Sequence, residues 1–256
     1  MKIVIIGSGN VATHLSLALK AAGEEIVQVF SLNLNNAETL AKRIQAEPIS
    51  NISKINRLAD LYIICVKDDA ISEIAKEFND IDGLVVHTSG STDIKVLSSE
   101  LKHVGVFYPL QTFSKTKDVD FANIPVCIEA TDAKQLDILK NIAHKLSSRV
   151  YTIDSEQRRV LHLAAVFACN FTNHMYAMAN QILLNNNIDF DIIKPLITET
   201  ADKILNDLPE NVQTGPAVRN DDNTINKHLN MLADLPKLQE IYITLSNSIK
   251  LSHKIV

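Results

Sequence analysis

Up to about residue 152, hydrophobic residues form short continuous runs that alternate with segments in which they recur every three or four positions. A short apolar run closed by turn residues predicts a buried strand, and the wider spacing predicts an amphipathic helix. Strands that alternate with helices are typical of a parallel sheet covered by helices. The predicted strands are residues 2–7, 25–31, 61–66, 83–89, 103–109, 124–130 and 148–153, and the predicted helices are residues 10–22, 36–44, 69–78 and 133–146.

After residue 152 the strand pattern disappears. Residues 154–186 have helical spacing of apolar positions throughout, with Asp154 or Ser155 as the N-cap, and further helices are predicted at 189–206, 222–233 and 236–252. We therefore predict an α/β fold of the Rossmann type, a doubly wound and mostly parallel sheet over residues 1–152. A smaller, mostly α-helical domain follows over residues 153–256.

The segment between the first strand and the first helix has the spacing G-x-G-x-x-A, at Gly7, Gly9 and Ala12. In a dinucleotide-binding turn the first position allows the tight turn, the second lets a diphosphate approach the backbone, and the third lets the helix pack on the strand. Free N–H groups at the helix start then face the phosphate. The alternatives are a tight turn without a ligand, or a site for another nucleotide-like ligand. The predicted cofactor-binding residues here are Gly7, Ser8, Gly9, Asn10, Val11 and Ala12.

The end of the second strand bears on which dinucleotide is bound. NAD-specific sites usually place Asp or Glu here, whereas this strand runs into Ser31, Leu32 and Asn33. Without a carboxylate, Ser31 and Asn33 are free to donate hydrogen bonds to a 2′-phosphate, so NADP is favoured and NAD remains possible. The alternative is that both are ordinary turn formers. Lys42 and Arg43, farther along the next helix, are expected to be solvated.

Two further strand ends meet the same edge of the sheet, where open α/β sheets bind ligands. We expect Val66 and Lys67 to line the cofactor site, and Asp68 or Asp69 to cap the next helix rather than bind a metal. The fifth strand ends in HTSGS, which lacks the nucleophile-elbow pattern, so no activated serine is predicted. The residues expected to line the nicotinamide pocket are Thr88, Ser89 and Gly90.

Composition excludes several classes of protein. The chain is 46% hydrophobic and 21% charged, with a formal net charge of -5, which is typical of a globular protein and argues against a nucleic-acid partner. No apolar run approaches the ~20 residues that span a bilayer, and no leader-like segment opens the sequence, so a cytoplasmic protein without a membrane partner is expected. Cys65, Cys127 and Cys169 are predicted to be buried thiols, neither disulfide-bonded nor metal-binding.

Six segments in order, GSGNVA, VKDDAI, HTSGS, FYPLQTF, HLAAVFACN and TGPAVRND, resemble the Rossmann-like NADP oxidoreductases that carry a C-terminal helical domain of unknown function. That family is similar to deazaflavin-dependent NADP oxidoreductases and pyrroline-5-carboxylate reductases. The resemblance covers nearly the whole chain. It implies a helical domain that often mediates dimer formation, so a homodimer is expected, and it leaves the substrate unassigned.

Two positions depart from the family pattern. The family more often has His-Pro-Leu-Gln where this chain has Tyr108, Pro109, Leu110 and Gln111, so the resemblance transfers no general acid to residue 108. Many relatives also carry an Arg beside Ser31, where this chain has Leu32.

The long predicted helix carries two candidate catalytic residues. His162 lies among Leu and Ala residues, and a polar group in apolar company is costly unless it has a partner. Asn170 follows eight positions later, about 80° around a regular helix, so the two side chains share one broad face. The alternative for His162 is a core histidine with its hydrogen bonds satisfied.

A third candidate is Arg219, in the segment TGPAVRND. With Asp221 it could hold a substrate carboxylate, or the two could form a salt bridge at a helix start. In related reductases the corresponding region approaches the active site, which favours Arg219. We therefore expect an oxidoreductase that transfers hydride between NADP and a small polar substrate. The alternatives are a nucleotide-responsive regulatory protein without turnover and, less favoured, a methyltransferase.

Overall fold

The computed structural model describes residues 1–252 of the 256-residue chain. The chain divides into two compact units, Met1–Asn170 and Phe171–Val256. The first unit contains the sheet. It extends beyond the predicted domain limit at residue 152, because α6 (Ser155–Ala165) packs with the residues of this unit. Each unit is described by itself.

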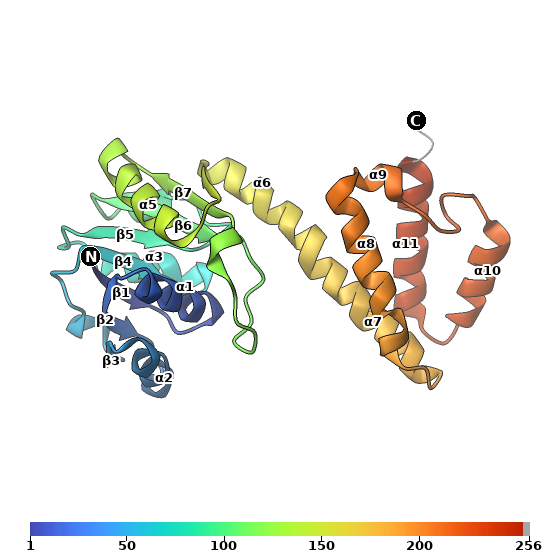
Figure 1. The fold of residues 1–256 in the computed structure, drawn as a ribbon, viewed down its shortest axis with the longest axis horizontal. Coiled ribbons are helices and arrows are strands. Elements are labelled where there is room, and N and C mark those ends of the chain that lie inside the picture. Colours follow the sequence, from blue (N-terminus) through green and yellow to red (C-terminus); the bar gives the residue numbers. More distant parts are fainter. Residues whose placement is uncertain (253–256) are drawn as a thin grey trace. The chain divides into compact units, whose positions relative to one another are not determined.

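The first unit is built on one eight-stranded sheet in the order β3-β2-β1-β4-β5-β6-β7-β8 (Figure 1). The order reverses between β1 and β4, which creates the crevice where doubly wound sheets bind their ligands. The predicted Rossmann-type fold is confirmed. The strands are β1 (Lys2–Ile6), β2 (Glu25–Phe30), β3 (Glu47–Ile49), β4 (Leu61–Ile64), β5 (Leu84–His87), β6 (Val104–Pro109), β7 (Val126–Ala130) and β8 (Val150–Thr152).

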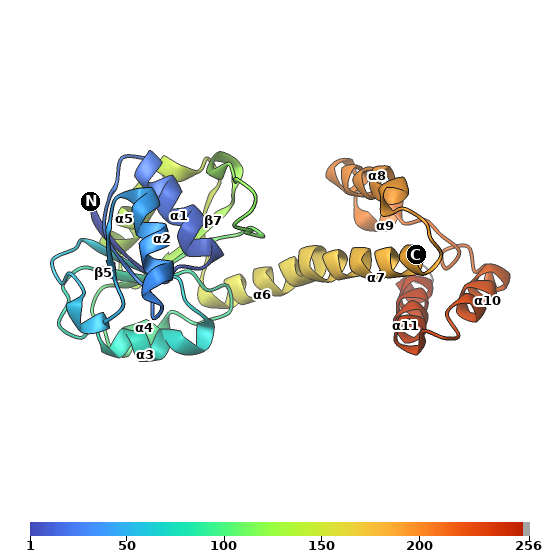
Figure 2. The same ribbon diagram turned by 90° about the horizontal axis from the view of Figure 1, so that it is seen from below.

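Helices cover both faces of this sheet. One apolar layer packs Ile3 and Ile5 of β1 against α1 (Asn10–Ala21), α2 (Leu34–Ile44) and α5 (Ala133–Leu146). The other layer packs Val4 and Ile6 against α3 (Ile71–Lys76) and α4 (Lys95–Ser98), and Figure 2 shows the two sets on opposite faces. Because β1 is buried on both faces, it reads as a continuous apolar run in the sequence.

The structure corrects the prediction of βαβ units throughout residues 1–152. The strand β7 runs antiparallel to β6, because the segment between them contains only the 3₁₀ turn η3 (Phe121–Asn123) and no crossover helix. The strand β3 was not predicted. The other short turns are η1 (Ile52–Lys54) and η2 (Asp68–Ala70).

The segment predicted as one helix over 154–186 consists of three pieces. The N-cap of α6 is Asp154, one of the two predicted residues, and its side chain accepts from the N–H of Gln157 in a capping box. A six-residue π-helical stretch, η4 (Val166–Phe171), follows, and then α7 (Thr172–Asn185). π-Helical turns are rare and are often found at functional sites.

The second unit is helical in its described part, as predicted. After α7 it contains η5 (Phe190–Ile193), α8 (Lys194–Asn206), α9 (Pro209–Val212), α10 (Asp222–Met231) and α11 (Pro236–Ser252). Neither α7 nor α8 buries a residue. No helix among residues 1–252 is long and apolar enough to cross a membrane.

Candidate functional site

A large cavity of about 1640 Å³ lies at the carboxyl edge of the sheet in the first unit. Its walls come from the segments that follow β1, β2, β4, β5 and β6, and from α6 and η4. Sites for single small molecules usually measure about 300–1,000 Å³. This cavity therefore has room for a dinucleotide together with a second molecule.

The two glycines of the first turn do different things. Gly7 has a φ of +117°, and a Cβ there would lie 2.2 Å from the backbone oxygen of Cys65, so the fold itself requires glycine. Gly9 has a φ of -75°, and a Cβ there would meet no atom within 4 Å. Because Gly9 also lines the cavity, its missing side chain leaves space for a ligand rather than for protein. Ala12 is buried under the turn and does not line the cavity.

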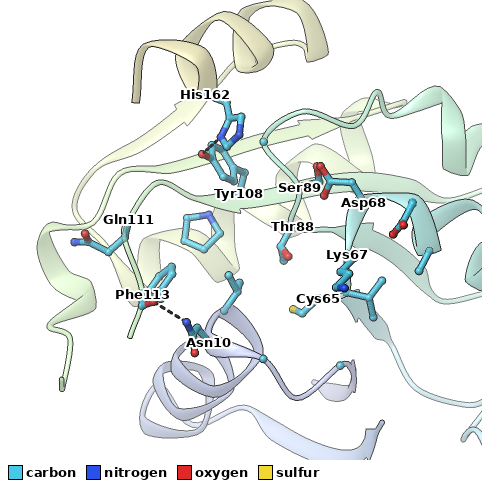
Figure 3. Close-up of a pocket in the computed structure, with 18 of the residues that line it drawn as sticks. Asn10, Cys65, Lys67, Asp68, Thr88, Ser89, Tyr108, Gln111, Phe113 and His162 are labelled. Atoms are coloured by element: carbon cyan, nitrogen blue, oxygen red, sulfur yellow. Dashed lines mark hydrogen bonds between the residues drawn. The ribbon is translucent and has the colours of Figure 1, made fainter. Parts of the chain in front are cut away.

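The N-terminus of α1 is available to an anion. Its N-cap is Gly9, and no side chain accepts a hydrogen bond from the first turn. The unpaired N–H groups and the helix dipole favour a phosphate at this position. Asn10 instead turns its Nδ2 toward the backbone oxygen of Phe113 at 2.8 Å, which ties the segment after β6 to this helix (Figure 3).

At the end of β2, Ser31 and Leu32 line the cavity, and Ser31 Oγ accepts from Ser8 Oγ at 3.0 Å. Asn33 does not line it. The Asn33 side chain caps α2 by accepting from the N–H of Asn36, in line with the turn-former alternative. No acidic side chain stands among these described residues at the end of β2, so nothing here repels a 2′-phosphate.

Val66, Lys67, Thr88, Ser89 and Gly90 all line the cavity, and their role in cofactor binding stays a prediction. The backbone turn after β5 is braced by its own side chains: Ser89 Oγ accepts from the N–H of Ser91 at 3.1 Å and of Thr92 at 3.0 Å. These bonds fix the turn that Gly90 occupies.

The expected capping by Asp68 or Asp69 is wrong. Asp68 and Asp69 lie within η2, and the N-cap of α3 is Ala70, so no side chain caps this helix. Asp68 accepts from the hydroxyl of Ser91 instead, which links the ends of β4 and β5. Among residues 1–252, no cluster of His, Cys, Asp and Glu has a metal-binding arrangement.

His87, beneath this turn, cannot serve as a proton donor at neutral pH. Burial lowers its pKa to about 3, and the nearby charge of Arg158 acts in the same direction. Its Nδ1 accepts from the N–H of Ser89 at 3.2 Å, so the neutral ring supports the turn. Burial also raises the pKa of the Cys65 thiol to about 12, which keeps this cysteine protonated and unreactive.

The cavity contains a hydrogen-bonded pair that joins β6 to α6. Tyr108 Oη lies 3.1 Å from His162 Nδ1, and the two rings meet edge to face (Figure 3). Burial raises the pKa of Tyr108 to about 12, so its hydroxyl keeps its proton at neutral pH. A Cβ on Gly90 would lie 2.7 Å from His162 Nδ1 and 2.9 Å from Tyr108 Cζ, so the turn after β5 presses directly on the pair.

Asn170 lines the same cavity as His162, from η4. Arg219 lies in the second unit, is exposed, and makes no ion pair within residues 1–252. Asp221 caps α10 by accepting from the N–H of Thr224 at 3.0 Å, which agrees with the helix-start alternative for this residue, whereas the salt bridge that the alternative gave Arg219 is not present in residues 1–252. The roles of Asn170 and Arg219 stay predictions.

The prediction that all three cysteines are buried is wrong for Cys169. Cys65 and Cys127 are buried in the sheet, whereas Cys169 is exposed and lines the cavity from η4. Its apolar neighbours in the sequence do not bury it, because Phe167 and Phe171 are themselves exposed. Tyr108 was not among the predicted site residues, although the segment FYPLQTF contains it.

Two family models match the sequence. Residues 2–89 match "NADP oxidoreductase coenzyme F420-dependent", and residues 124–249 match a domain of unknown function, DUF2520. No curated protein matches the chain.

Several solved structures are similar to this one. A Bacteroides fragilis protein, provisionally named an NADP oxidoreductase, is 48% identical over 97% of both chains, with a TM-score of 0.93. An imine reductase from Myxococcus stipitatus in complex with NADP+ is 13% identical over 99% of this chain and 93% of its own (TM-score 0.70). A pyrroline-5-carboxylate reductase from Coxiella burnetii is 15% identical over 98% and 97% (TM-score 0.59). The last two show a shared fold.

The identity of 48% over nearly the full length of both chains is far above the level at which only the fold is shared. This protein therefore belongs to the family of NADP oxidoreductases in which a Rossmann domain is followed by a helical domain of unknown function.

Proposed function

We propose that this protein transfers hydride between NADP and a small polar substrate. The observation that carries the proposal is one cavity that brings together the open space at Gly9, the uncapped start of α1 and the Tyr108–His162 pair. The residues present fit NADP, because the open space at Gly9 and the uncapped start of α1 suit its diphosphate. The nicotinamide would supply or accept the hydride when bound.

The protein itself has to orient the nicotinamide and to donate or accept one proton. Thr88, Ser89 and Gly90 offer hydroxyl and backbone groups beside the pair. Tyr108 holds a proton that its raised pKa retains at neutral pH, and His162 is within hydrogen-bond reach to replace it. We assign proton donation to Tyr108 with His162, and substrate orientation to Asn170. Arg219 is proposed to bind a substrate carboxylate.

Turnover tests the proposal directly. The purified chain is incubated with NADPH and a panel of cyclic imines and 2-oxo acids, or with NADP+ and 2-hydroxy acids, while absorbance at the nicotinamide band is followed. We expect substrate-dependent oxidation of NADPH or reduction of NADP+ by at least one compound class. Saturable NADPH binding with no turnover across a broad panel would instead favour the regulatory protein without catalysis.

Changing Tyr108→Phe should lower kcat by about 10²- to 10⁴-fold, because it removes the donated proton while keeping the ring. The Kd for NADPH, measured by calorimetry, should stay within about twofold of the wild-type value, since the proposed diphosphate site at Gly9 is unchanged. Tyr151→Phe is the matched control: Tyr151 is half exposed on β8 and does not line the cavity. Equal kcat values for Tyr108→Phe and Tyr151→Phe would remove Tyr108 from the mechanism.

We also propose that the protein is a homodimer formed through its second unit. Its helices leave large apolar side chains exposed, which is unusual for a monomer in water. Leu184 of α7 is 63% exposed, and Leu196 and Leu205 of α8 are 65% and 80% exposed. Sedimentation equilibrium should give twice the chain mass of 28.4 kDa. A mass of one chain at micromolar concentration would contradict the dimer.

A further inference from the structure

A small recess of about 70 Å³ lies between α1 and α2, separate from the large cavity. Its lining consists of one apolar residue, Leu40, of hydroxyl and amide side chains from Ser8, Thr13, Asn36 and Thr39, and of two cations, Arg43 and Lys115. None of the described residues that line it is acidic. A concave surface with two positive charges and several hydroxyl groups suits an anion.

The recess adjoins the large cavity through Ser8, which lines both. Ser8 Oγ donates to Ser31 Oγ at 3.0 Å, and Ser31 stands at the end of β2. In dinucleotide-binding folds the adenosine ribose lies at this strand end, where an acidic residue would hold its 2′-hydroxyl or a cation would hold a 2′-phosphate. The recess is therefore next to the place where NAD and NADP differ.

Arg43 reaches the recess along the surface of α2. Asn36, Thr39 and Arg43 are spaced three and four positions apart, so they lie on one face of the helix. Side chains on a helix lean toward its N-terminus, and the N-terminus of α2 follows directly after β2. The interpretation of Arg43 as merely solvated is thus incomplete: the residue is exposed, but its side chain lines a recess at the end of β2.

Lys115 is held over the recess by contacts of its own segment with α1. His14 Nε2 lies 2.8 Å from the backbone oxygen of Ser114, and the rings of His14 and Phe113 stack 5.3 Å apart. These contacts hold the backbone beside Lys115 before any ligand binds. A preorganised backbone lowers the entropy lost on binding.

Neither cation is neutralised by the protein. Within residues 1–252, Arg43 and Lys115 form no ion pair. Leu32, which takes the place beside Ser31 where a cation could stand, is 89% exposed. Two cations without an acidic partner thus flank the recess, whereas the turn at Ser31 and Leu32 carries no cation.

We propose that this recess binds the 2′-phosphate of NADP, with Arg43 and Lys115 as the residues that determine specificity for NADP over NAD. The inference rests on the proposed function, since it places one end of the dinucleotide. Arg43 offers paired N–H donors to the phosphate oxygens, Lys115 offers a point charge, and the hydroxyls of Ser8 and Thr39 complete the surface.

Calorimetric titrations of the full chain with NADPH, NADH and adenosine 2′,5′-bisphosphate test this assignment. Arg43→Ala and Lys115→Ala should each weaken binding of NADPH and of the bisphosphate by about tenfold to a hundredfold, as expected for a lost hydrogen bond to a charged group. Binding of NADH should change by less than about twofold. The matched control is Lys42→Ala, an exposed neighbour on α2 that does not line the recess, and it should alter neither affinity.

Three results would overturn the assignment. The wild-type chain could bind NADPH and NADH equally well, Lys42→Ala could match Arg43→Ala, or the two variants could weaken NADH as much as NADPH. In each of these cases dinucleotide binding itself still stands, so the proposed function survives. If the wild-type chain binds neither dinucleotide, the proposed function fails along with the recess.

Discussion

Changing Gly9→Ala is expected to weaken NADPH binding by about 5- to 150-fold while the protein stays folded. The added methyl group would stand in the space where the diphosphate approaches the backbone, and overpacking of one methyl group costs about 1–3 kcal/mol. No protein atom lies within 4 Å of that position, and the φ of -75° is open to alanine. The cost therefore falls on the ligand rather than on the fold.

Gly7→Ala provides the contrast, because the two glycines are only two positions apart. At Gly7 the new Cβ would collide with the backbone oxygen of Cys65, and the φ of +117° is strained for alanine. We expect loss of stability in thermal unfolding for Gly7→Ala, and loss of affinity in calorimetry for Gly9→Ala. If a folded Gly9→Ala variant bound NADPH as tightly as the wild-type chain, the proposed binding of the diphosphate at Gly9 would be contradicted.

Changing Arg158→Ala should lower the free energy of unfolding of the first unit by about 3–5 kcal/mol, the range for breaking a buried ion pair from one side. Arg158 is 1% exposed and forms an ion pair with Glu129. It also donates to the backbone oxygen of Thr92 and to Ser155. Removing the guanidinium leaves the Glu129 carboxylate without its counter-charge, and only the hydroxyl of Ser155 then links this carboxylate of β7 to α6.

Urea unfolding followed by circular dichroism measures this loss. The matched control is Arg159→Ala, one position along the same helix, where the side chain is 46% exposed and pairs with Asp93 at 3.1 Å. Exposed pairs of this kind contribute about 0.2–1 kcal/mol, so Arg159→Ala should be nearly neutral. Arg158→Met combined with Glu129→Leu should recover part of the stability lost in Arg158→Ala. Equal losses for Arg158→Ala and Arg159→Ala would contradict the view that burial makes the Arg158 pair important.

Much of the fold could be predicted because parallel strands buried on both faces leave an unbroken apolar signal. This holds for β1 and β4, and the glycine turn between β1 and α1 follows from spacing alone. The strand β3 could not be predicted, since Glu47–Ile49 is short and contains Pro48. The strand β7 is antiparallel to β6 because the segment between them has no crossover helix. The spacing of apolar residues does not show the direction in which a strand pairs.

The candidate site was predictable only in part. His162 stood out because it is polar among Leu and Ala residues. Its partner, Tyr108, is 54 residues away in the sequence, and only the packing of α6 beside the end of β6 brings the two together. Arg43 and Lys115 likewise share a recess because α1 anchors the segment that carries Lys115. Contacts of this kind arise from tertiary structure and leave no local pattern.

We expect the crevice at the carboxyl edge of the sheet to hold a nicotinamide dinucleotide. A crystal structure of the full chain grown with NADP+ tests it most directly. The diphosphate should lie against the backbone of Gly9 and Asn10, with the nicotinamide beside Gly90 and Tyr108. A dinucleotide bound outside this cavity, or a cavity without one at saturating NADP+, would contradict the claim.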